Sequence, residues 1–219
     1  RLSANTTAGF SIVTYTGAGA YGSTVAHGLS QAPELILYKN VDVVREWAVY
    51  SNQLTSNHYY LVLNTTAAED TDTGRFNDTT PTATVFTLGD GPITNENTKE
   101  QIAYCFHSVE GYSKVGSYEG NANADGPFIY TGFKPAFIII KAVDQAGASW
   151  FQFDDKRDTY NVVNHELFAD SNAAEGTGSR LLDFVSNGFK SRANDAINYA
   201  STMLYYAVAE SPFKTSNAR

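Results

Sequence analysis

The amino-acid sequence predicts an all-β protein built from two tandem antiparallel β-sandwich repeats. Tyrosine and phenylalanine are abundant, at 14 and 13 residues, and together with threonine, valine and isoleucine they favour strands over helices. Short apolar segments recur at even spacing, separated by glycine, asparagine and aspartate, which tolerate the positive φ angles of tight turns. In addition, the second half of the chain repeats the pattern of the first half.

The predicted strands of the first half are short, and turn-forming residues separate them. They cover residues 10–16, 23–26, 35–39, 46–50, 59–63, 84–88 and 101–107. In the second half, Asn187-Gly188 lies between two apolar segments and predicts a two-residue hairpin turn. Helical periodicity is nearly absent from the sequence. The best helical candidate is Asn172–Glu175, where we expect at most one short turn.

Equivalent positions of the two halves lie about 102 residues apart. Pro33 precedes an apolar strand that ends at Lys39, and Pro135 precedes a similar strand that ends at Lys141. The other repeated markers are Trp47 with Trp150, Tyr104 with Tyr206, Gly9–Val13 with Gly111–Val115, and Thr66–Glu69 with Asn172–Glu175. A repeat of this length is the size of a domain, and about seven short strands suffice to close one sandwich.

We therefore expect a lead-in segment at residues 1–8, a first β-sandwich repeat at 9–110 and a second at 111–219. One larger, concanavalin-like jelly roll formed by both halves is the alternative. Six of the repeated markers are interpreted as core residues: Pro33, Pro135, Trp47, Trp150, Tyr104 and Tyr206. Of these, Trp47 and Trp150 are expected to be large side chains that fill the two interiors. The alternative for these tryptophans is an exposed ring that stacks on a sugar.

Composition excludes several classes of partner. The chain has 23 acidic and 15 basic residues, and a net charge of −8 disfavours nucleic acid and anionic membranes as partners. No apolar run approaches the roughly 18 residues that span a bilayer, so we expect no membrane insertion. The single cysteine, Cys105, permits no internal disulfide. The chain opens at Arg1 and its only methionine is Met203, which predicts a processed or partial chain.

The sequence contains no constellation that points to catalysis. The four histidines lack metal-site spacing, and we expect His27, at the end of a strand, to stabilise a turn by hydrogen bonding. Glu69–Gly74 resembles the opening of a calcium loop, but Pro81 stands where the bidentate acid is required. The sequence leaves open whether a long loop binds a calcium ion. Nucleophile-elbow, phosphate-loop and dinucleotide motifs are missing, so we expect no catalytic residue, no metal ligand, no cofactor and no enzyme activity.

Motifs along nearly the whole chain match those of one family of tandem β-domains. They include Val13-Thr-Tyr-Thr-Gly17, Val25-Ala-His-Gly-Leu29, Trp47-Ala-Val-Tyr50, Val85-Phe-Thr-Leu-Gly89, Ala103-Tyr-Cys-Phe106 and Gly111-Tyr-Ser-Lys114. With these motifs the chain resembles domains of bacteriophage tail-fibre and other virion structural proteins. The resemblance implies modules without catalytic residues at the surface of a virion. Ser30 and Gln31, in place of a further glycine after Leu29, depart from the family pattern without threatening the fold.

The expected function is therefore that of a non-enzymatic virion surface protein, of tail-fibre, spike or decoration type, which serves assembly and host attachment. We expect a homo-oligomer, other virion proteins and a host-surface glycan as partners, at the virion surface or outside the cell. One alternative is a glycan-binding module with Tyr21, Tyr59 and Tyr112 as stacking residues, although packing also explains each of them. The other is an extracellular filament or surface-layer subunit joined by edge strands.

Overall fold

The structure, a computed structural model, describes residues 1–213, and these residues form two compact units. The first unit comprises Arg1–Asn64 and Glu69–His107, and the second comprises Thr65–Ala68 and the chain from Ser108 onward. The prediction divided the chain between residues 110 and 111, close to this division. Thr65–Ala68, which lie in the middle of the first repeat, nevertheless belong to the second unit. All strand pairs between the described elements are antiparallel, which confirms the all-β prediction.

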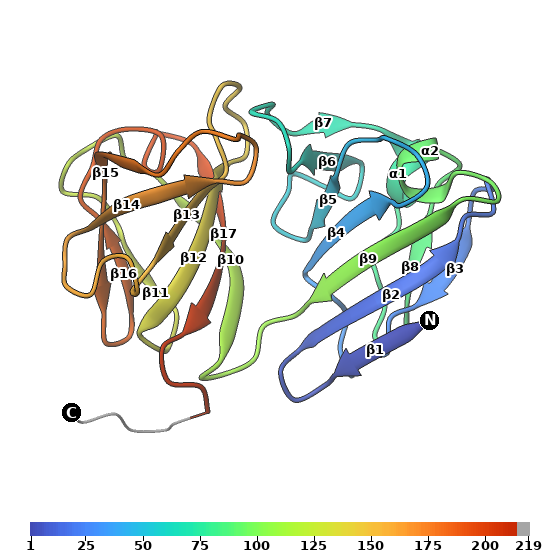
Figure 1. The fold of residues 1–219 in the computed structure, drawn as a ribbon, viewed down its shortest axis with the longest axis horizontal. Coiled ribbons are helices and arrows are strands. Elements are labelled where there is room, and N and C mark those ends of the chain that lie inside the picture. The colour runs from blue at the N-terminus through green and yellow to red at the C-terminus, as the bar shows by residue number, and fades with distance from the viewer. Residues whose placement is uncertain (214–219) are drawn as a thin grey trace. The chain divides into compact units, whose positions relative to one another are not determined.

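The first unit is a large sheet packed on a two-stranded ribbon (Figure 1). Its strands are β1 (Leu2–Asn5), β2 (Phe10–Thr16), β3 (Ser23–Ala26), β4 (Leu35–Asn40), β5 (Ala48–Ser51), β6 (Tyr59–Val62), β7 (Asp70–Thr71), β8 (Val85–Leu88) and β9 (Glu100–Phe106). The large sheet has the order β1-β2-β9-β4-β5-β6-β7, and β3 pairs with β8. Residues 1–8, expected to be a lead-in, contribute β1 to this sheet.

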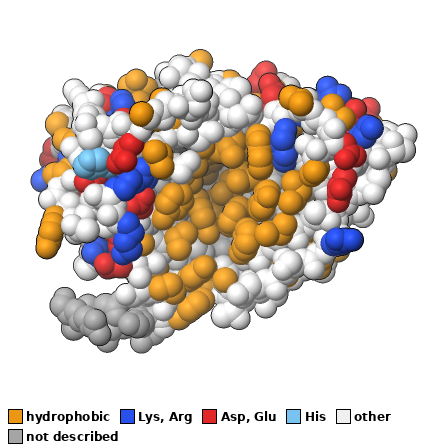
Figure 2. Space-filling model, viewed as in Figure 1, with side chains coloured by type: hydrophobic (Ala, Val, Ile, Leu, Met, Phe, Trp, Pro, Cys, Tyr) orange, Lys and Arg blue, Asp and Glu red, His pale blue; other side chains and the backbone are white. Residues whose placement is uncertain are grey.

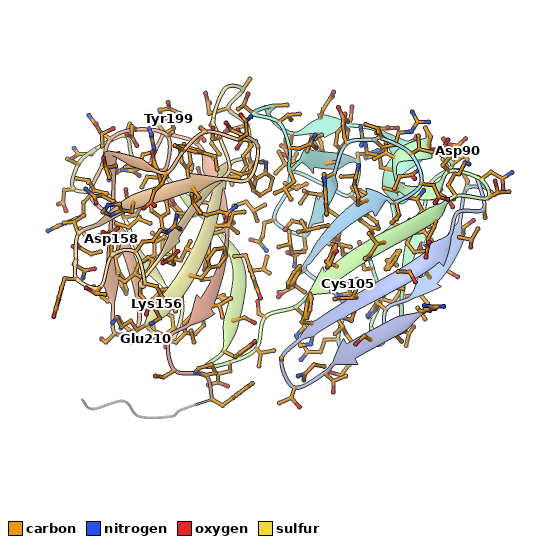
Figure 3. The ribbon with its side chains drawn as sticks, viewed as in Figure 1. Asp90, Cys105, Lys156, Asp158, Tyr199 and Glu210 are labelled. Carbon is orange, nitrogen blue, oxygen red and sulfur yellow. The ribbon has the colours of Figure 1, made fainter. Side chains whose placement is uncertain are left out.

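Along β2 and β9, buried residues that face the core of the first unit alternate with less buried ones, as the two-residue period of strands requires. Tyr38 of β4 is the centre of this core, with its ring 5.4 Å from Phe86 of β8 and 5.4 Å from Phe76. Cys105 of β9 lies in the same cluster and is fully buried, and burial raises the pKa of its thiol to about 12. Figure 3 labels this residue on its strand.

The second unit is a single sheet that folds over its own core. Its strands are β10 (Ser113–Glu119), β11 (Phe128–Tyr130), β12 (Pro135–Ala142), β13 (Phe151–Asp154), β14 (Val163–Phe168), β15 (Gly176–Val185), β16 (Gly188–Ser191) and β17 (Thr202–Ala209). Their order is β10-β17-β12-β13-β14-β15-β16-β11. The long strand β15 joins the two layers, and Phe189 of β16 packs its ring 5.3 Å from that of Tyr205 of β17.

The described residues contain two short helices, and both lie elsewhere than the sequence predicts. They are α1 (Thr73–Phe76) and α2 (Pro92–Asn95), whereas Asn172–Glu175 is not helical. The Asp72 side chain accepts a hydrogen bond from Gly74 N and begins α1, so a cap rather than an apolar period signals this turn. The predicted hairpin is present, but its turn is Ser186-Asn187, because Gly188 already pairs with Val185. No helix in the described part of the chain combines the length and apolar character that crossing a bilayer requires.

The two units share the strand order β2-β9-β4-β5-β6 and β10-β17-β12-β13-β14. Ile12 pairs with Tyr104 and Val115 pairs with Tyr206, so Val115 is the equivalent of Ile12. The sequence comparison, which aligned Gly9–Val13 with Gly111–Val115, was therefore wrong by one residue in this strand. A slip of one residue assigns every side chain of a strand to the opposite face of the sheet.

Candidate functional site

The three tyrosines predicted to stack on a glycan do not form one site. Tyr21 is 56% exposed in the turn between β2 and β3, and Tyr59 is half-buried at the start of β6. Tyr112 belongs to the second unit, where its ring stacks on Phe213 with a centroid distance of 4.9 Å. Within the second unit, packing on Phe213 explains Tyr112. The structure gives Tyr21 and Tyr59 no ring contact with one another among the described residues.

Trp150 is buried, as its interpretation as a core residue predicts, whereas Trp47, Tyr104 and Tyr206 are only half-buried and lie outside the two core clusters. Trp47 is half-buried, and its ring stacks on Tyr104 at a centroid distance of 6.2 Å. Tyr104 points away from the core because its neighbours Ala103 and Cys105 point into it. Trp150 is 3% exposed and is one of the buried hydrophobic residues, although it lies outside the large cluster of the second unit, and Tyr206 is half-buried. Pro33 and Pro135 are buried, as expected of core residues. Pro33 lies just before β4, and Pro135 is the first residue of β12.

The side of the large sheet opposite the core of the first unit is apolar, and we call it the outer face. Figure 2 shows hydrophobic side chains gathered over β2, β4 and β9 on this side. The outer face is formed by half-buried residues that alternate with core residues along their strands: Phe10, Ile12, Leu37, Lys39, Trp47, Ile102, Tyr104 and Phe106. A sheet that uses one face for its own core usually presents a polar face to solvent. An apolar outer face of this kind is typical of an interaction surface.

In each unit a lysine donates a hydrogen bond to the carbonyl oxygen of the residue two positions before the tryptophan. Lys39 Nζ is 5.9 Å from the centre of the Trp47 ring and donates a hydrogen bond to the carbonyl oxygen of Arg45. The equivalent Lys141 is fully buried, and its Nζ donates to the carbonyl oxygens of Ala148 at 2.6 Å and Thr66 at 3.4 Å. Burial lowers the pKa of Lys141 to about 8, although the nearby Asp170 carboxylate opposes this shift. The sequence did not predict a buried lysine, because a lysine at a strand end normally extends into water.

The second unit contains a cavity of about 220 Å³ beside the loop that follows β13. It is lined by Lys134, Asp155, Asp158, Thr159, Tyr160, Asn161, Val163 and Phe184. Asp158, labelled in Figure 3, accepts hydrogen bonds from the backbone N–H groups of Asn164 and His165, and pairs with His165 Nδ1 at 2.6 Å. Burial alone raises the pKa of Asp158, but these hydrogen bonds outweigh it and hold the pKa below its ordinary value. Lys134 pairs with Glu210 at 3.2 Å. These partners make the charged groups part of the loop's structure.

The residues considered for metal binding have structural partners. His27 is buried, with Nδ1 accepting from Leu29 N and Nε2 hydrogen-bonded to the carbonyl oxygen of Thr82 at 3.1 Å, so it does hold a turn. In the segment considered for calcium, Asp70 belongs to β7, while Asp72 caps α1 and lies 3.3 Å from Arg75. Within residues 1–213, no group of three or more histidine, cysteine or acidic side chains has an arrangement that suits a metal ion.

A buried arginine was missed in the sequence. Arg75 of α1 is 5% exposed, and its guanidinium lies 3.5 Å from the centre of the Tyr60 ring. Glu46 and Asp72 lie within 3.6 Å and 3.3 Å of it. The ring and the two carboxylates together compensate the charge of a cation that has lost its water. Arg75 therefore acts as a structural link between α1 and the strand β6.

Comparisons with known proteins assign the chain to a family without assigning a function. No curated protein and no solved structure matches the chain. A family model described as a domain of unknown function, DUF7483, matches residues 1–212. Since this match covers nearly all of the sequence, the chain belongs to the DUF7483 family.

Proposed function

We propose that the protein is a non-enzymatic structural module of a virion surface, which assembles with other copies and other virion proteins through its β units. The observation that carries this proposal is the outer face of the first unit, where aromatic and aliphatic side chains cover the side of the sheet that its own core does not use. The resemblance of the chain's motifs to tail-fibre and related virion proteins supports the virion as the place of assembly.

The way the charged groups are used supports the same proposal. The described acidic and basic side chains that are most buried, including Arg75, Lys141 and Glu166, each contact protein groups that hold a loop or a strand in place. A structural module exposed outside a cell benefits from such internal pairing, because it has no disulfide to limit unfolding. In this proposal the exposed loops bind the host, because changes in the sequence of a surface loop do not disturb the two cores.

Labelling of intact particles tests this function directly. An antibody raised against the purified chain and detected with gold is expected to decorate particles produced from the genome that encodes it. Particles that carry no label, while the denatured particle proteins also lack the chain by mass spectrometry, would show that the proposal is wrong. A control antibody against an unrelated protein sets the background of labelling.

A glycan-binding module is the second candidate, and the Trp47–Tyr104 pair specifically favours it. Half-buried stacked rings beside a lysine suit a sugar, whose apolar face stacks on aromatic rings while its hydroxyls accept from an ammonium group. We expect Trp47→Ala to lower binding to any glycan that the wild-type chain retains on an array by about tenfold or more. Tyr160→Ala, which removes an exposed ring in the second unit, is the matched control. Absence of binding above background for the wild type excludes this candidate.

A further inference from the structure

Two equivalent segments, here named straps, follow strand β6 in the first repeat and strand β14 in the second. The first strap is Thr65–Ala68 and the second is Ser171–Ala174. Both are anchored in the same way, because Trp47 N donates to Asn64 Oδ1 at 2.9 Å and Trp150 N donates to Asp170 Oδ1 at 2.7 Å. Both also contain the same local turn, in which the hydroxyl of their first residue accepts from the backbone N–H two residues later. The straps therefore have one local structure at two places.

The first strap belongs to the second unit, where it completes the surroundings of a lysine. The carbonyl oxygen of Thr66 accepts hydrogen bonds from Gly147 N at 2.8 Å and from Lys141 Nζ at 3.4 Å. Lys141 is 0% exposed in this arrangement and Trp150 is 3% exposed. We call Lys141, Gly147 and Trp150 the strap site of the second unit.

The first unit has an equivalent strap site, formed by Lys39, Val44 and Trp47. Lys39 Nζ donates to the carbonyl oxygen of Arg45, as Lys141 Nζ donates to that of Ala148, so the two lysines are oriented alike. Among residues 1–213, however, no strap covers the first site. Lys39 and Trp47 are half-buried rather than buried, and Val44 is 97% exposed. Val44 directly precedes Arg45, whose carbonyl oxygen accepts from Lys39 Nζ, so an exposed aliphatic side chain lies next in sequence to the residue that binds a lysine with further donors.

The second strap has the properties that this site requires. Ser171–Ala174 are all exposed and belong to no strand or helix. They repeat the two alanines of the first strap, Ala67 and Ala68, as Ala173 and Ala174. Asn172 occupies the position of Thr66, and within the described residues its carbonyl oxygen accepts no hydrogen bond. One chain thus carries both an unused strap and an unused strap site.

We propose that the second strap of one copy binds the strap site of the first unit of another copy, as the first strap binds the strap site of the second unit. In this contact the Asn172 carbonyl oxygen accepts from Lys39 Nζ, and Ala173 and Ala174 cover Val44. The contact joins different surfaces of identical chains, so it repeats head to tail and produces a ring or an open row of copies. This inference rests on the proposed assembly role and names the partner as a second copy.

Disulfide trapping between two single variants tests the contact. Val44→Cys and Asn172→Cys both replace exposed residues, and the native Cys105 is buried, so it does not compete. We expect a mixture of the two variants to form a disulfide-linked dimer under mild oxidation, and the double variant to form a ladder of multiples. Tyr160→Cys, at a position 86% exposed, replaces Asn172→Cys in the control mixture and is expected to give much less dimer. Equal dimer in both mixtures, or a double variant that closes only an internal disulfide, overturns the proposal.

Analytical ultracentrifugation of the full chain tests the same contact without cysteines. Val44→Asp and Ala173→Asp put a carboxylate into the proposed contact and are expected to weaken self-association about tenfold or more, whereas Tyr160→Asp leaves it unchanged. Undiminished association of both contact variants overturns the strap contact but leaves assembly through another surface. A wild-type chain that stays monomeric at every concentration also overturns the contact, while labelling of particles decides the proposed function separately.

Discussion

Lys39 and Lys141 show how one residue type at equivalent positions acquires different properties from its surroundings. Each is the penultimate residue of its strand, β4 or β12, and each donates a hydrogen bond to a carbonyl oxygen of the following loop. Lys141 is fully buried, and this burial lowers its pKa to about 8. In the unfolded chain the pKa returns to its ordinary value of 10.5, so the two states bind different numbers of protons between these pH values.

The sign of this difference gives a prediction for Lys141. Below pH 8 the folded state carries the full cost of a buried charge, and between pH 8 and 10.5 the unfolded state binds more protons. The contribution of Lys141 to the free energy of unfolding is therefore expected to rise as the pH is raised through this window. Urea unfolding followed by tryptophan fluorescence at several pH values measures it. Lys141→Met is expected to remove this rise, and an unchanged pH dependence in the variant contradicts the explanation.

Two tyrosine hydroxyls provide a second prediction at this scale. Tyr15 and Tyr118 each donate a 2.6 Å hydrogen bond to a backbone carbonyl oxygen, of Thr94 and Ile197 respectively. Replacement of either tyrosine by phenylalanine leaves that carbonyl without its partner, and we expect a loss of about 1–2 kcal/mol in the free energy of unfolding. Tyr21→Phe, at an exposed position, is expected to change it by less than about 0.5 kcal/mol. Equal effects of the three variants in urea unfolding would contradict this account.

At the scale of elements, the short helix α1 packs against the turn that follows β8, and glycine is essential to this contact. A Cβ atom on Gly89 would lie 2.2 Å from the carbonyl oxygen of Gly74, a distance that no real Cβ contact shows. The backbone of Gly89 also donates a 3.2 Å hydrogen bond to the carbonyl oxygen of Arg75. The approach of the two backbones therefore depends on the missing side chain.

Gly89→Ala is expected to destabilise the chain by about 3 kcal/mol, because two backbone segments must move apart. The matched control is Gly22→Ala, which has open space around the added Cβ but a φ of 75°. This control carries only the cost of a left-handed residue, about 1 kcal/mol. The two values are measured by urea unfolding under identical conditions. A larger effect at Gly22 than at Gly89 would show that the close approach is unimportant.

The strands and helices also show how much of the secondary structure the sequence could predict. Strands were predicted well, because their two-residue period and the turns between them are local: β2 and β3 have the predicted bounds. The helices were missed because a single turn such as α1 depends on the capping side chain of Asp72 and has no apolar period. Trp47 was assigned to the core because size and apolarity do not distinguish the two faces of a sheet, which only the register decides.

At the scale of the whole molecule, the repeat itself could be predicted but its division could not. The equivalence of Thr66–Glu69 and Asn172–Glu175 is visible in the sequence, where the two segments are one of the repeated markers. That Thr65–Ala68 belong to the second unit depends on the hydrogen bonds of Thr66 with Gly147 and Lys141, which no local pattern encodes. The proposed contact between copies therefore depends on tertiary structure and could not be predicted from the sequence.

The buried Cys105 allows the transient unfolding of the first unit to be measured separately, by the rate at which its thiol is modified. It is the sole cysteine of the chain, and its sulfur lies in the core between β2 and β4. A thiol reagent added to the native chain therefore modifies one atom, and only when strand β9 has separated from its neighbours. The rate of this modification in the purified chain therefore measures how often that half of the molecule opens transiently.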